Sequence, residues 1–259
     1  MPENEPAVLL PEERRRRILE KLAAEGRVFA ADLCRFLRVS EDTIRRDLKD
    51  LDEAGRLRKV HGGALARAQE AQAHGERERV NPEQKRALAQ VAAARVRPGQ
   101  VLLLDGGTTL LEVARALPRE LRATVLTVSP LVSLALAEHP GLEVHLLGGR
   151  LHPRALTTVG AQTLETLSRV RADLCLLGVC GLHAEAGITS AFAEEAVIKR
   201  TMIQNAAETV AVVTADKLGT VSPFGVAPAA RLAALVTEAA VPEAARAPFL
   251  QLHIQVLTP

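Results

Sequence analysis

Apolar side chains recur at helical spacing in three stretches near the start of the chain. The first two stretches predict short helices over Arg14–Ala24 and Ala31–Leu37, with Gly26 ending the first. A third helix is predicted from Ser40, which is a suitable N-cap, to Gly55, which stops it. The positions predicted to form the buried faces of these helices are Ile18, Leu19, Leu22, Leu33, Phe36, Leu37, Ile44, Leu48 and Leu51.

The segment Arg56–Ala64 alternates apolar with basic side chains and closes on a Gly-Gly turn, which predicts a basic β-hairpin. Three short helices and such a hairpin are typical of a winged helix-turn-helix, which reads base edges with its third helix and follows phosphates with its wing. A small helical oligomerisation domain is the alternative, but it does not explain the Arg-rich outer face. The residues predicted to contact DNA are Ser40, Thr43, Arg45, Arg46, Lys49, Arg58, Lys59 and His61.

Charge is concentrated in the same part of the chain. Residues 14–67 hold fifteen Lys or Arg against nine Asp or Glu, although the 259 residues together have a formal net charge of only +2. A basic segment on a neutral body favours a polyanion as the partner of that segment alone. The chain has five Phe and no Trp or Tyr, so it lacks the aromatic platforms that single-stranded nucleic acids stack on. Double-stranded DNA is therefore the expected partner.

The chain then changes character. Residues 67–82 are polar without a steady apolar period, which predicts a linker between a domain of residues 1–66 and one of residues 83–259. In the second domain, apolar runs alternate with amphipathic stretches, as in a parallel α/β sheet with helices on both faces. The predicted strands are Val101–Leu104, Thr124–Val128, Leu142–Leu147, Leu174–Gly178, Thr209–Val213 and Leu232–Val236.

Ligands of such sheets bind outside the carboxyl ends of the strands, where this chain has small and hydroxyl-bearing loops. Asp105–Thr109 opens a helix, so its backbone N–H groups and two Thr hydroxyls suit an anion, although a plain turn and N-cap is the alternative. Lys217 is a candidate phosphate contact, although on its own an ordinary surface lysine is the simpler interpretation. The residues predicted to bind a small effector are Asp105, Gly106, Gly107, Thr108, Thr109, Ser129, Gly148, Gly149, Arg150 and Lys217.

Three ordered motifs, Thr43–Leu48, Leu51–Leu57 and Val60–Ala64, resemble the signature of DeoR-type bacterial transcriptional regulators. The resemblance implies that Arg45 and Arg46 belong to the DNA-reading helix. It also implies a C-terminal sensor domain similar in fold to ribose-5-phosphate isomerase, which senses phosphorylated sugars or related metabolites. The motifs that extend the resemblance over the rest of the chain are Asp105–Thr109, Gly148–Gly149, Val159–Gly160, Asp173–Gly178, Gly181, Gly187–Thr189 and Glu195–Met202.

By position, the resemblance places a phosphate on Gly106–Thr109 and matches Lys217 to the lysine of the family's Asp-x-Ser-Lys segment. Two positions depart from the family's pattern. Val128 stands where the family commonly has Asn, which removes an amide from a presumed sugar contact. Thr214 and Asp216 stand where the family has Asp and Ser, and an aspartate facing the cleft would weaken phosphate binding.

An isomerase with a fused basic domain is the enzymatic alternative, and it requires a positioned carboxylate base. The isomerases that this fold resembles carry such acids in an Asp-Gly-Ala-Asp-Glu type run, but the corresponding Leu177–Leu182 has none; the nearest acids are Asp173 and Glu185. The three cysteines lack zinc-ligand spacing, and neither a P-loop nor a dinucleotide motif is present. We therefore expect neither catalytic residues nor a metal or cofactor. An oligomeric scaffold without a ligand is the third possibility.

These patterns favour a transcriptional regulator, expected to repress a sugar or carbon-metabolism operon under the control of a phosphorylated metabolite. A homo-oligomer, either a dimer or a tetramer, is expected because paired recognition helices give an affinity that one small module lacks. No apolar run reaches the roughly 18 residues that cross a membrane. The acidic residues 1–11 lack a signal-peptide pattern, so a cytoplasmic protein is expected.

Overall fold

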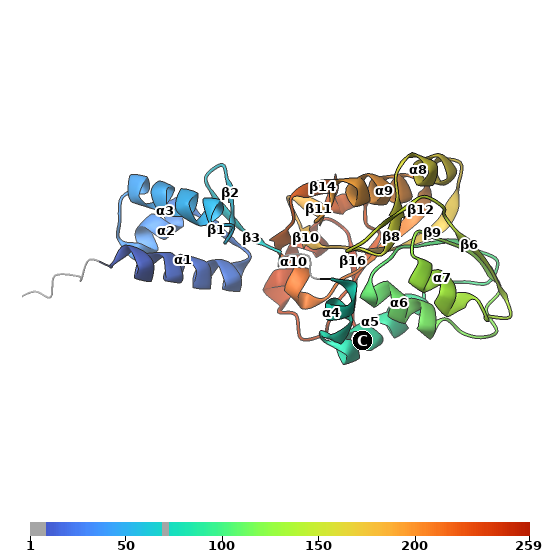
Figure 1. Ribbon diagram of the computed structural model, residues 1–259. Helices are drawn as coiled ribbons and strands as arrows, with labels where there is room; N and C mark the ends of the chain where they lie inside the picture. Colours follow the sequence, from blue (N-terminus) through green and yellow to red (C-terminus); the bar gives the residue numbers. More distant parts are fainter. Residues whose placement is uncertain (1–8, 69–72) are drawn as a thin grey trace, which may run out of the picture. The chain divides into compact units, whose positions relative to one another are not determined.

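The structure, a computed structural model, describes residues 9–68 and 73–259 and contains two compact units (Figure 1). The N-terminal unit comprises the described residues up to Arg67 together with Gly219–Val221, and the remaining described residues form the C-terminal unit. Part of the expected linker, residues 69–72, lies outside the described residues. The rest of it, from Ala73 onward, belongs to the C-terminal unit and begins with a helix.

The N-terminal unit has three helices and a small sheet, as predicted for a winged helix-turn-helix. Strand β3 is central in this sheet: β1 and β2 pair with it antiparallel and β13 pairs with it parallel. The turn of the predicted wing lies between β2 and β3, where Gly62 has a φ of +77°, a conformation that favours glycine. The elements are α1 (Pro11–Glu25), β1 (Arg27–Phe29), α2 (Ala30–Leu37), α3 (Glu41–Glu53), β2 (Arg58–Val60), β3 (Gly63–Arg67) and β13 (Thr220–Val221).

The core of this unit follows the predicted apolar stripes. Most of the predicted positions are buried, Leu19 is half-buried, and Leu57 from the wing completes the cluster. The prediction for Phe36 was wrong. Its side chain is 54% exposed, and the Lys21 ammonium lies 5.2 Å from its ring centroid. A phenylalanine at helical spacing therefore packs beneath a lysine at the surface, where a cation–π contact replaces burial.

The C-terminal unit is built on a seven-stranded parallel sheet of order β16-β15-β12-β9-β4-β5-β6 (Figure 1). All six predicted strands are present, because runs of consecutive apolar residues are what a strand needs when helices cover both of its faces. The strands are β4 (Val101–Leu104), β5 (Ala123–Thr127), β6 (Leu142–Leu146), β9 (Ala172–Gly178), β12 (Ala206–Val212), β15 (Ala234–Val236) and β16 (Gln255–Leu257).

Alternate residues of each central strand enter different cores. Leu102 and Leu104 of β4 pack with α5, α6 and α7 on one face, whereas Leu103 packs with α8, α9 and α10 on the other. The helices of this unit are α4 (His74–Arg79), α5 (Pro82–Ala93), α6 (Thr108–Ala116), α7 (Pro130–Leu136), α8 (Ala161–Ser168), α9 (Ala193–Gln204) and α10 (Glu243–Gln251). None of the helices in the described residues is long and apolar enough to cross a membrane.

The strand order reverses beside β4. The chain steps from β4 to β5 and β6 in one direction, and then places β9, β12, β15 and β16 on the other side of β4. Loops leaving β4 and β9 therefore diverge and leave a crevice at the carboxyl ends of these strands, the usual ligand position in open α/β sheets. Shorter elements surround it: β7 (Arg150–His152), β8 (Thr157–Val159), β10 (Gly181–His183), β11 (Gly187–Ser190), β14 (Phe224–Ala227) and two 3-10 turns, η1 (Ala215–Lys217) and η2 (Ala229–Arg231).

Candidate functional site

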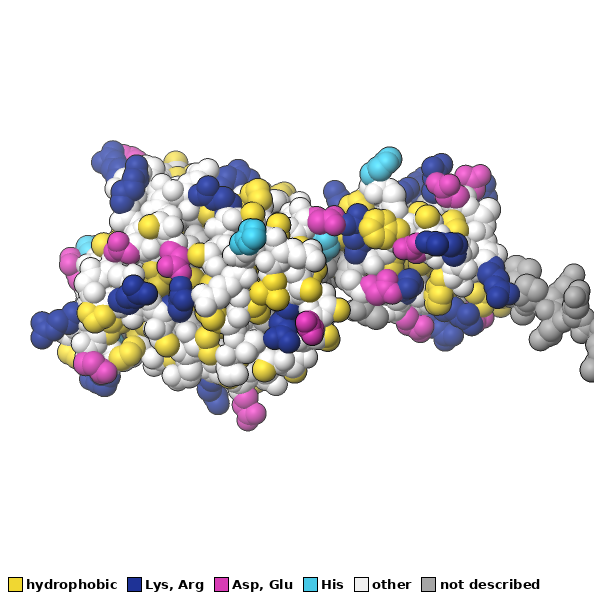
Figure 2. Space-filling view, turned by 180° about the vertical axis from the view of Figure 1, so that it is seen from behind, with side chains coloured by type: hydrophobic (Ala, Val, Ile, Leu, Met, Phe, Trp, Pro, Cys, Tyr) yellow, Lys and Arg dark blue, Asp and Glu magenta, His cyan; other side chains and the backbone are white. Residues whose placement is uncertain are grey.

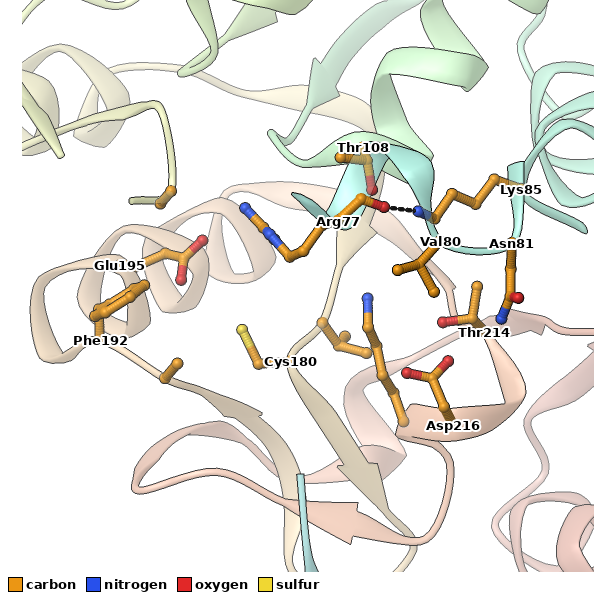
Figure 3. A pocket seen from close by; sticks show the side chains of 14 residues that line it. Arg77, Val80, Asn81, Lys85, Thr108, Cys180, Phe192, Glu195, Thr214 and Asp216 are labelled. Atoms are coloured by element: carbon orange, nitrogen blue, oxygen red, sulfur yellow. Dashed lines mark hydrogen bonds between the residues drawn. The ribbon is translucent and has the colours of Figure 1, made fainter. Parts of the chain in front are cut away.

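A cleft opens at this crevice (Figure 3). An adjoining smaller pocket shares much of its lining and reaches the loop after β4. Thr108, Glu195 and Lys217 line both parts. The two parts therefore form one site, to which the ends of β4, β9 and β12 all contribute.

The loop after β4 has the geometry of an anion cradle. Gly107 is the N-cap of α6 with a φ of +105°, and the first N–H groups of a helix have no partners within it. Thr108 and Thr109 are buried beside these groups. Gly106 is glycine for a packing reason, because an added Cβ would lie 2.3 Å from a methyl carbon of Thr157. The loop thus combines a positive helix end with hydroxyl groups at the cleft surface.

A buried ion-pair network lies beneath the cleft. The Lys199 ammonium bonds the carboxylate of Asp105, donates to the carbonyl oxygen of Gly178 at 3.0 Å, and lies 3.5 Å from the carboxylate of Glu195. Burial alone would lower the pKa of Lys199, but the two carboxylates raise it above its ordinary value. Asp105 also accepts a hydrogen bond from the N–H of Gly178 at 3.0 Å. Asp105, predicted as an effector contact, therefore joins β4 to β9 and does not line the cleft.

Cations from separate elements surround the cleft. Arg77 comes from α4, Lys85 from α5 and Lys217 from η1. Burial is the largest influence on the pKa of Lys85 and of Lys217 and lowers both, and the charge of Arg77 lowers both further. Like charges that disfavour one another around a confined space are relieved by an anion. The electrostatics of the cleft therefore suit an anionic ligand.

The structure brings together only part of the predicted effector residues. Gly106–Thr109 and Lys217 line the cleft. Ser129 is the buried N-cap of α7 and lies against Gly106 without reaching the cleft surface. Gly148 and Gly149 lie outside the cleft lining, as does Arg150, whose exposed guanidinium pairs with Glu194.

The two departures from the family's pattern have different outcomes. Val128 is buried in the apolar core, so this substitution concerns packing and no longer bears on the cleft surface. Thr214 and Asp216 both line the cleft (Figure 3). The second departure therefore places a carboxylate next to Lys217 on the cleft surface.

Several cleft residues escaped the sequence predictions. Arg77 lies in the segment interpreted as a linker, and Lys85 lies in the first turn of α5 outside any motif. Glu195 and Lys199 are four residues apart on α9, a spacing typical of solvent-exposed ion pairs, yet both are buried. Phe192 precedes the same helix and gives the cleft an apolar wall. Glu195 and Lys199 belong to a motif of the family resemblance, but only the packing of α9 on the sheet shows that both are buried.

Although the run Leu177–Leu182 contains no carboxylate, the cleft lining does include that of Glu195. Burial raises the pKa of Glu195, but Lys199, the Ser190 hydroxyl and Arg77 together hold it below its ordinary value. Ser190 donates to its carboxylate at 2.7 Å. This carboxylate is therefore engaged by an ion pair and a hydrogen bond beneath the cleft. Within the described ranges, no group of three His, Cys, Asp or Glu side chains is placed to hold a metal.

The second candidate site is the outer face of α3 and the wing. Ser40 caps α3, as predicted, by accepting a hydrogen bond from the N–H of Thr43 at 3.3 Å. Thr43 is half-buried and the other predicted DNA contacts are exposed. Arg45 pairs with Glu41 on the same helix at 2.8 Å, an exposed and weak interaction. On the face drawn in Figure 2, Lys and Arg side chains are spread over the N-terminal unit.

Asp47, within the same motif, has a structural position. Its buried carboxylate pairs with Arg14 of α1, whose Nη2 donates to it at 3.1 Å, and with Arg15 at 3.2 Å. These bonds attach α1 to the inner side of α3. Not all of the basic residues near the start of the chain are therefore available to DNA.

Comparison with known proteins bears on both sites. Residues 14–70 match the family model of the DeoR-like helix-turn-helix domain, and residues 80–239 match that of the DeoR C-terminal sensor domain. The chain is 37% identical over 213 residues to the HTH-type transcriptional regulator GlpR of Haloferax volcanii, covering 82% of this chain and 83% of that protein. It is 34% identical over 229 residues to the HTH-type transcriptional repressor GlcR of Bacillus subtilis, covering 88% of each.

The Glycerol-3-phosphate regulon repressor of Escherichia coli is 28% identical over 245 residues, covering 94% of this chain and 97% of that protein. Among solved structures, ribose 5-phosphate isomerase A from Methanocaldococcus jannaschii matches 53% of this chain and 54% of its own at 19% identity and a TM-score of 0.39. These relatives in sequence are named as transcriptional regulators and not as enzymes. The chain belongs to the DeoR family of transcriptional regulators.

Proposed function

We propose that this regulator represses an operon of sugar or carbon metabolism and leaves its operator when a phosphorylated sugar or related metabolite enters the cleft. The observation that carries the proposal is the cation-rich cleft at the reversal of strand order, in a chain that also has a winged helix-turn-helix. The name of the Escherichia coli relative, which refers to glycerol 3-phosphate, supports a phosphate ester as the effector.

The phosphate of the effector binds at the N-terminus of α6. There the backbone N–H groups of the first turn, the hydroxyl groups of Thr108 and Thr109 and the ammonium of Lys217 can all contact its oxygens. The rest of the effector extends into the larger part of the cleft. Asn81 and Asp216 offer polar groups to sugar hydroxyls there, and Phe192 offers an apolar wall to the carbon skeleton.

On DNA, Arg45 and Arg46 of α3 contact base edges in the major groove, while Arg58 and Lys59 of the wing contact phosphates. One such module contacts too few bases for a specific operator. The protein therefore acts on chromosomal DNA in the cytoplasm as a homo-oligomer, a dimer or tetramer whose recognition helices occupy successive half-sites.

The direct test measures binding of the purified protein to DNA from upstream of its own gene cluster and to random duplex DNA, over a range of salt concentrations. A panel of sugar phosphates is then added to the complex. Binding that survives competitor DNA and is released by one phosphate ester would support the proposal. Binding no tighter than to random DNA, or turnover of a pentose phosphate, would contradict it.

We predict that replacing both Arg45 and Arg46 with Ala lowers operator affinity at least about 30-fold, because each good base contact contributes roughly 1–3 kcal/mol. Affinity for random duplex falls much less. The matched control removes the same charge with Arg16→Ala and Arg35→Ala, two exposed arginines of α1 and α2. Fluorescence anisotropy with both DNAs measures the two affinities. Equal losses on operator and random DNA in the α3 variant would exclude α3 as the reading helix.

A further inference from the structure

Helix α4 lies in the stretch between the parts of the chain that match the two family domains, which end at residue 70 and begin at residue 80. It starts at His74, seven residues after the last residue of β3, Arg67. Yet its residue Arg77 lines both parts of the effector cleft. A segment that belongs to neither matched domain therefore contributes a cation to the site.

The guanidinium of Arg77 is only partly satisfied by the protein. In Figure 3 its side chain extends from α4 toward Glu195. Its Nη2 donates to the carbonyl oxygen of Arg154 at 3.4 Å, which is long for a hydrogen bond. Its Nε is buried and has no hydrogen-bond partner. A buried donor without a partner is costly, and an anion in the cleft is the ligand that would satisfy it.

The positive charge of Arg77 acts on three other charged groups of the cleft. It lowers the pKa values of Glu195, Lys85 and Lys217. Burial has a larger effect on all three and raises the pKa of Glu195, while Lys199 lowers the pKa of Glu195, and Lys217 that of Lys85, more than Arg77 does. It makes no ion pair within 4.0 Å in the described residues, so its charge is balanced only at longer range. A planar guanidinium in this position suits two oxygens of one phosphate or carboxylate group.

Helix α4 itself is held by few interactions. Lys85 donates to the carbonyl oxygen of Arg77, and Glu76 caps the backbone N–H of Ala73 at 3.2 Å. Beyond these, His74 is its one buried side chain, and Glu78 lies 3.8 Å from Arg115 of α6. A six-residue helix with so few contacts gains substantially from any additional one. A ligand bound by Arg77 would therefore order α4.

We propose that Arg77 binds an anionic group of the effector, and that this contact fixes α4 and so transmits occupancy of the cleft to the segment leading from the DNA-binding domain. The inference rests on the proposed function and adds its regulation. Occupancy acts directly on α4, the first helix of the C-terminal unit, through a side chain of that helix, and does not have to be relayed through the core of the sensor domain.

The test titrates full-length protein with sn-glycerol 3-phosphate, glucose 6-phosphate and inorganic phosphate by calorimetry, and repeats this with Arg77→Gln. The loss of a charged contact predicts at least a tenfold weaker Kd for whichever compound the wild type binds most tightly. Arg77→Lys keeps the charge but lacks the planar guanidinium, so its Kd is expected to lie between those of the wild type and Arg77→Gln. The matched control is Arg79→Gln, an exposed arginine two residues further along α4, which should bind like the wild type.

Hydrogen exchange of residues 73–80 tests whether a ligand in the cleft stabilises α4. The same ligand at saturation should slow exchange there at least fivefold in the wild type and in Arg79→Gln, and not in Arg77→Gln. Unchanged exchange of α4 in ligand-bound wild type would overturn the role of α4.

Thr108→Val separates failure of the inference from failure of the function. Weaker binding by Thr108→Val with wild-type binding by Arg77→Gln would leave the effector site in place and overturn the role of Arg77. A wild type that binds none of the three compounds would overturn both.

Discussion

Asp216 is the charged one of the two residues, with Thr214, at which the chain departs from the family's pattern on the cleft surface. Its carboxylate repels an anionic ligand, yet it also supports the charge of its neighbour. Burial lowers the pKa of Lys217, and Asp216 is the strongest influence in the opposite direction. The two effects of Asp216 on phosphate binding therefore have opposite signs, and the pH decides which of them is larger.

We predict that Asp216→Ser, which restores the family's residue, tightens binding of the preferred phosphate ester about five- to tenfold at pH 6.5. Two unit charges about 4 Å apart in a water-like dielectric interact with an energy of about 1 kcal/mol, so removing a like charge near the phosphate is worth roughly this amount. The lowered pKa of Lys217 falls further in the variant, so its ammonium is lost at a lower pH than in the wild type, and the gain should be smaller at pH 9 than at pH 6.5. Calorimetry at both pH values measures this.

Glu83→Gln, which removes an exposed carboxylate of α5, serves as the control for a general change of charge. Weaker binding by Asp216→Ser already at pH 6.5 would mean that the carboxylate contributes more as a partner of Lys217, or of a sugar hydroxyl, than it costs by repulsion.

At the scale of elements, the attachment of α1 to α3 depends on Asp47. Removing one partner of a buried ion pair leaves the other charge unpaired, which costs about 3–5 kcal/mol. We predict that Asp47→Asn unfolds the N-terminal unit at a much lower urea concentration than in the wild type, with loss of operator binding. Asp50→Asn, which removes the exposed partner of Arg15 one turn further along α3, should cost less than about 1 kcal/mol.

Far-UV circular dichroism of the two variants in urea compares them directly. Similar midpoints for Asp47→Asn and Asp50→Asn would show that α1 is held to α3 by the apolar core alone. In that case the aspartate of the motif would have to be explained by DNA binding.

The elements that the sequence predicts well are those whose local pattern and tertiary role agree. The strands β4, β9 and β12 are apolar runs because both of their faces are buried, and Ser40 caps α3 because a serine before an acidic first turn favours that geometry. The loop Gly106–Thr109 follows from the same reasoning, since strand ends determine where ligands bind.

Other elements carry no local signal. Helix α4 has six residues and one buried side chain, too few for an apolar period, so the sequence places Arg77 in a polar linker. The pair Glu195 and Lys199 has the spacing of a surface ion pair, and only the packing of α9 on the sheet buries it. Gly148–Arg150 shows the reverse case, a strand-end loop with the expected composition that lies outside the cleft.

At the scale of the whole molecule, control of one site by the other is a coupling free energy and must be reciprocal. If the effector weakens operator binding by a given factor, saturating operator DNA must weaken effector binding by the same factor, and couplings of this kind are typically 5- to 150-fold. We predict that effector changes the operator Kd, measured by anisotropy, by the same factor as operator changes the effector Kd, measured by calorimetry.

Thr108→Val tests the same coupling between effector and operator binding through a change in the cleft. A variant that loses effector affinity equally in the free and DNA-bound protein keeps the coupling factor and only needs more effector for release. Other variants lose an effector contact that is made in the free protein but not in the DNA-bound protein. Such a variant brings the coupling factor closer to one. We expect the first result for Thr108→Val, at the N-terminus of α6, and the second for Arg77→Gln, on the helix that follows the linker. Equal coupling factors in the two variants would contradict this division of roles between the cradle and α4.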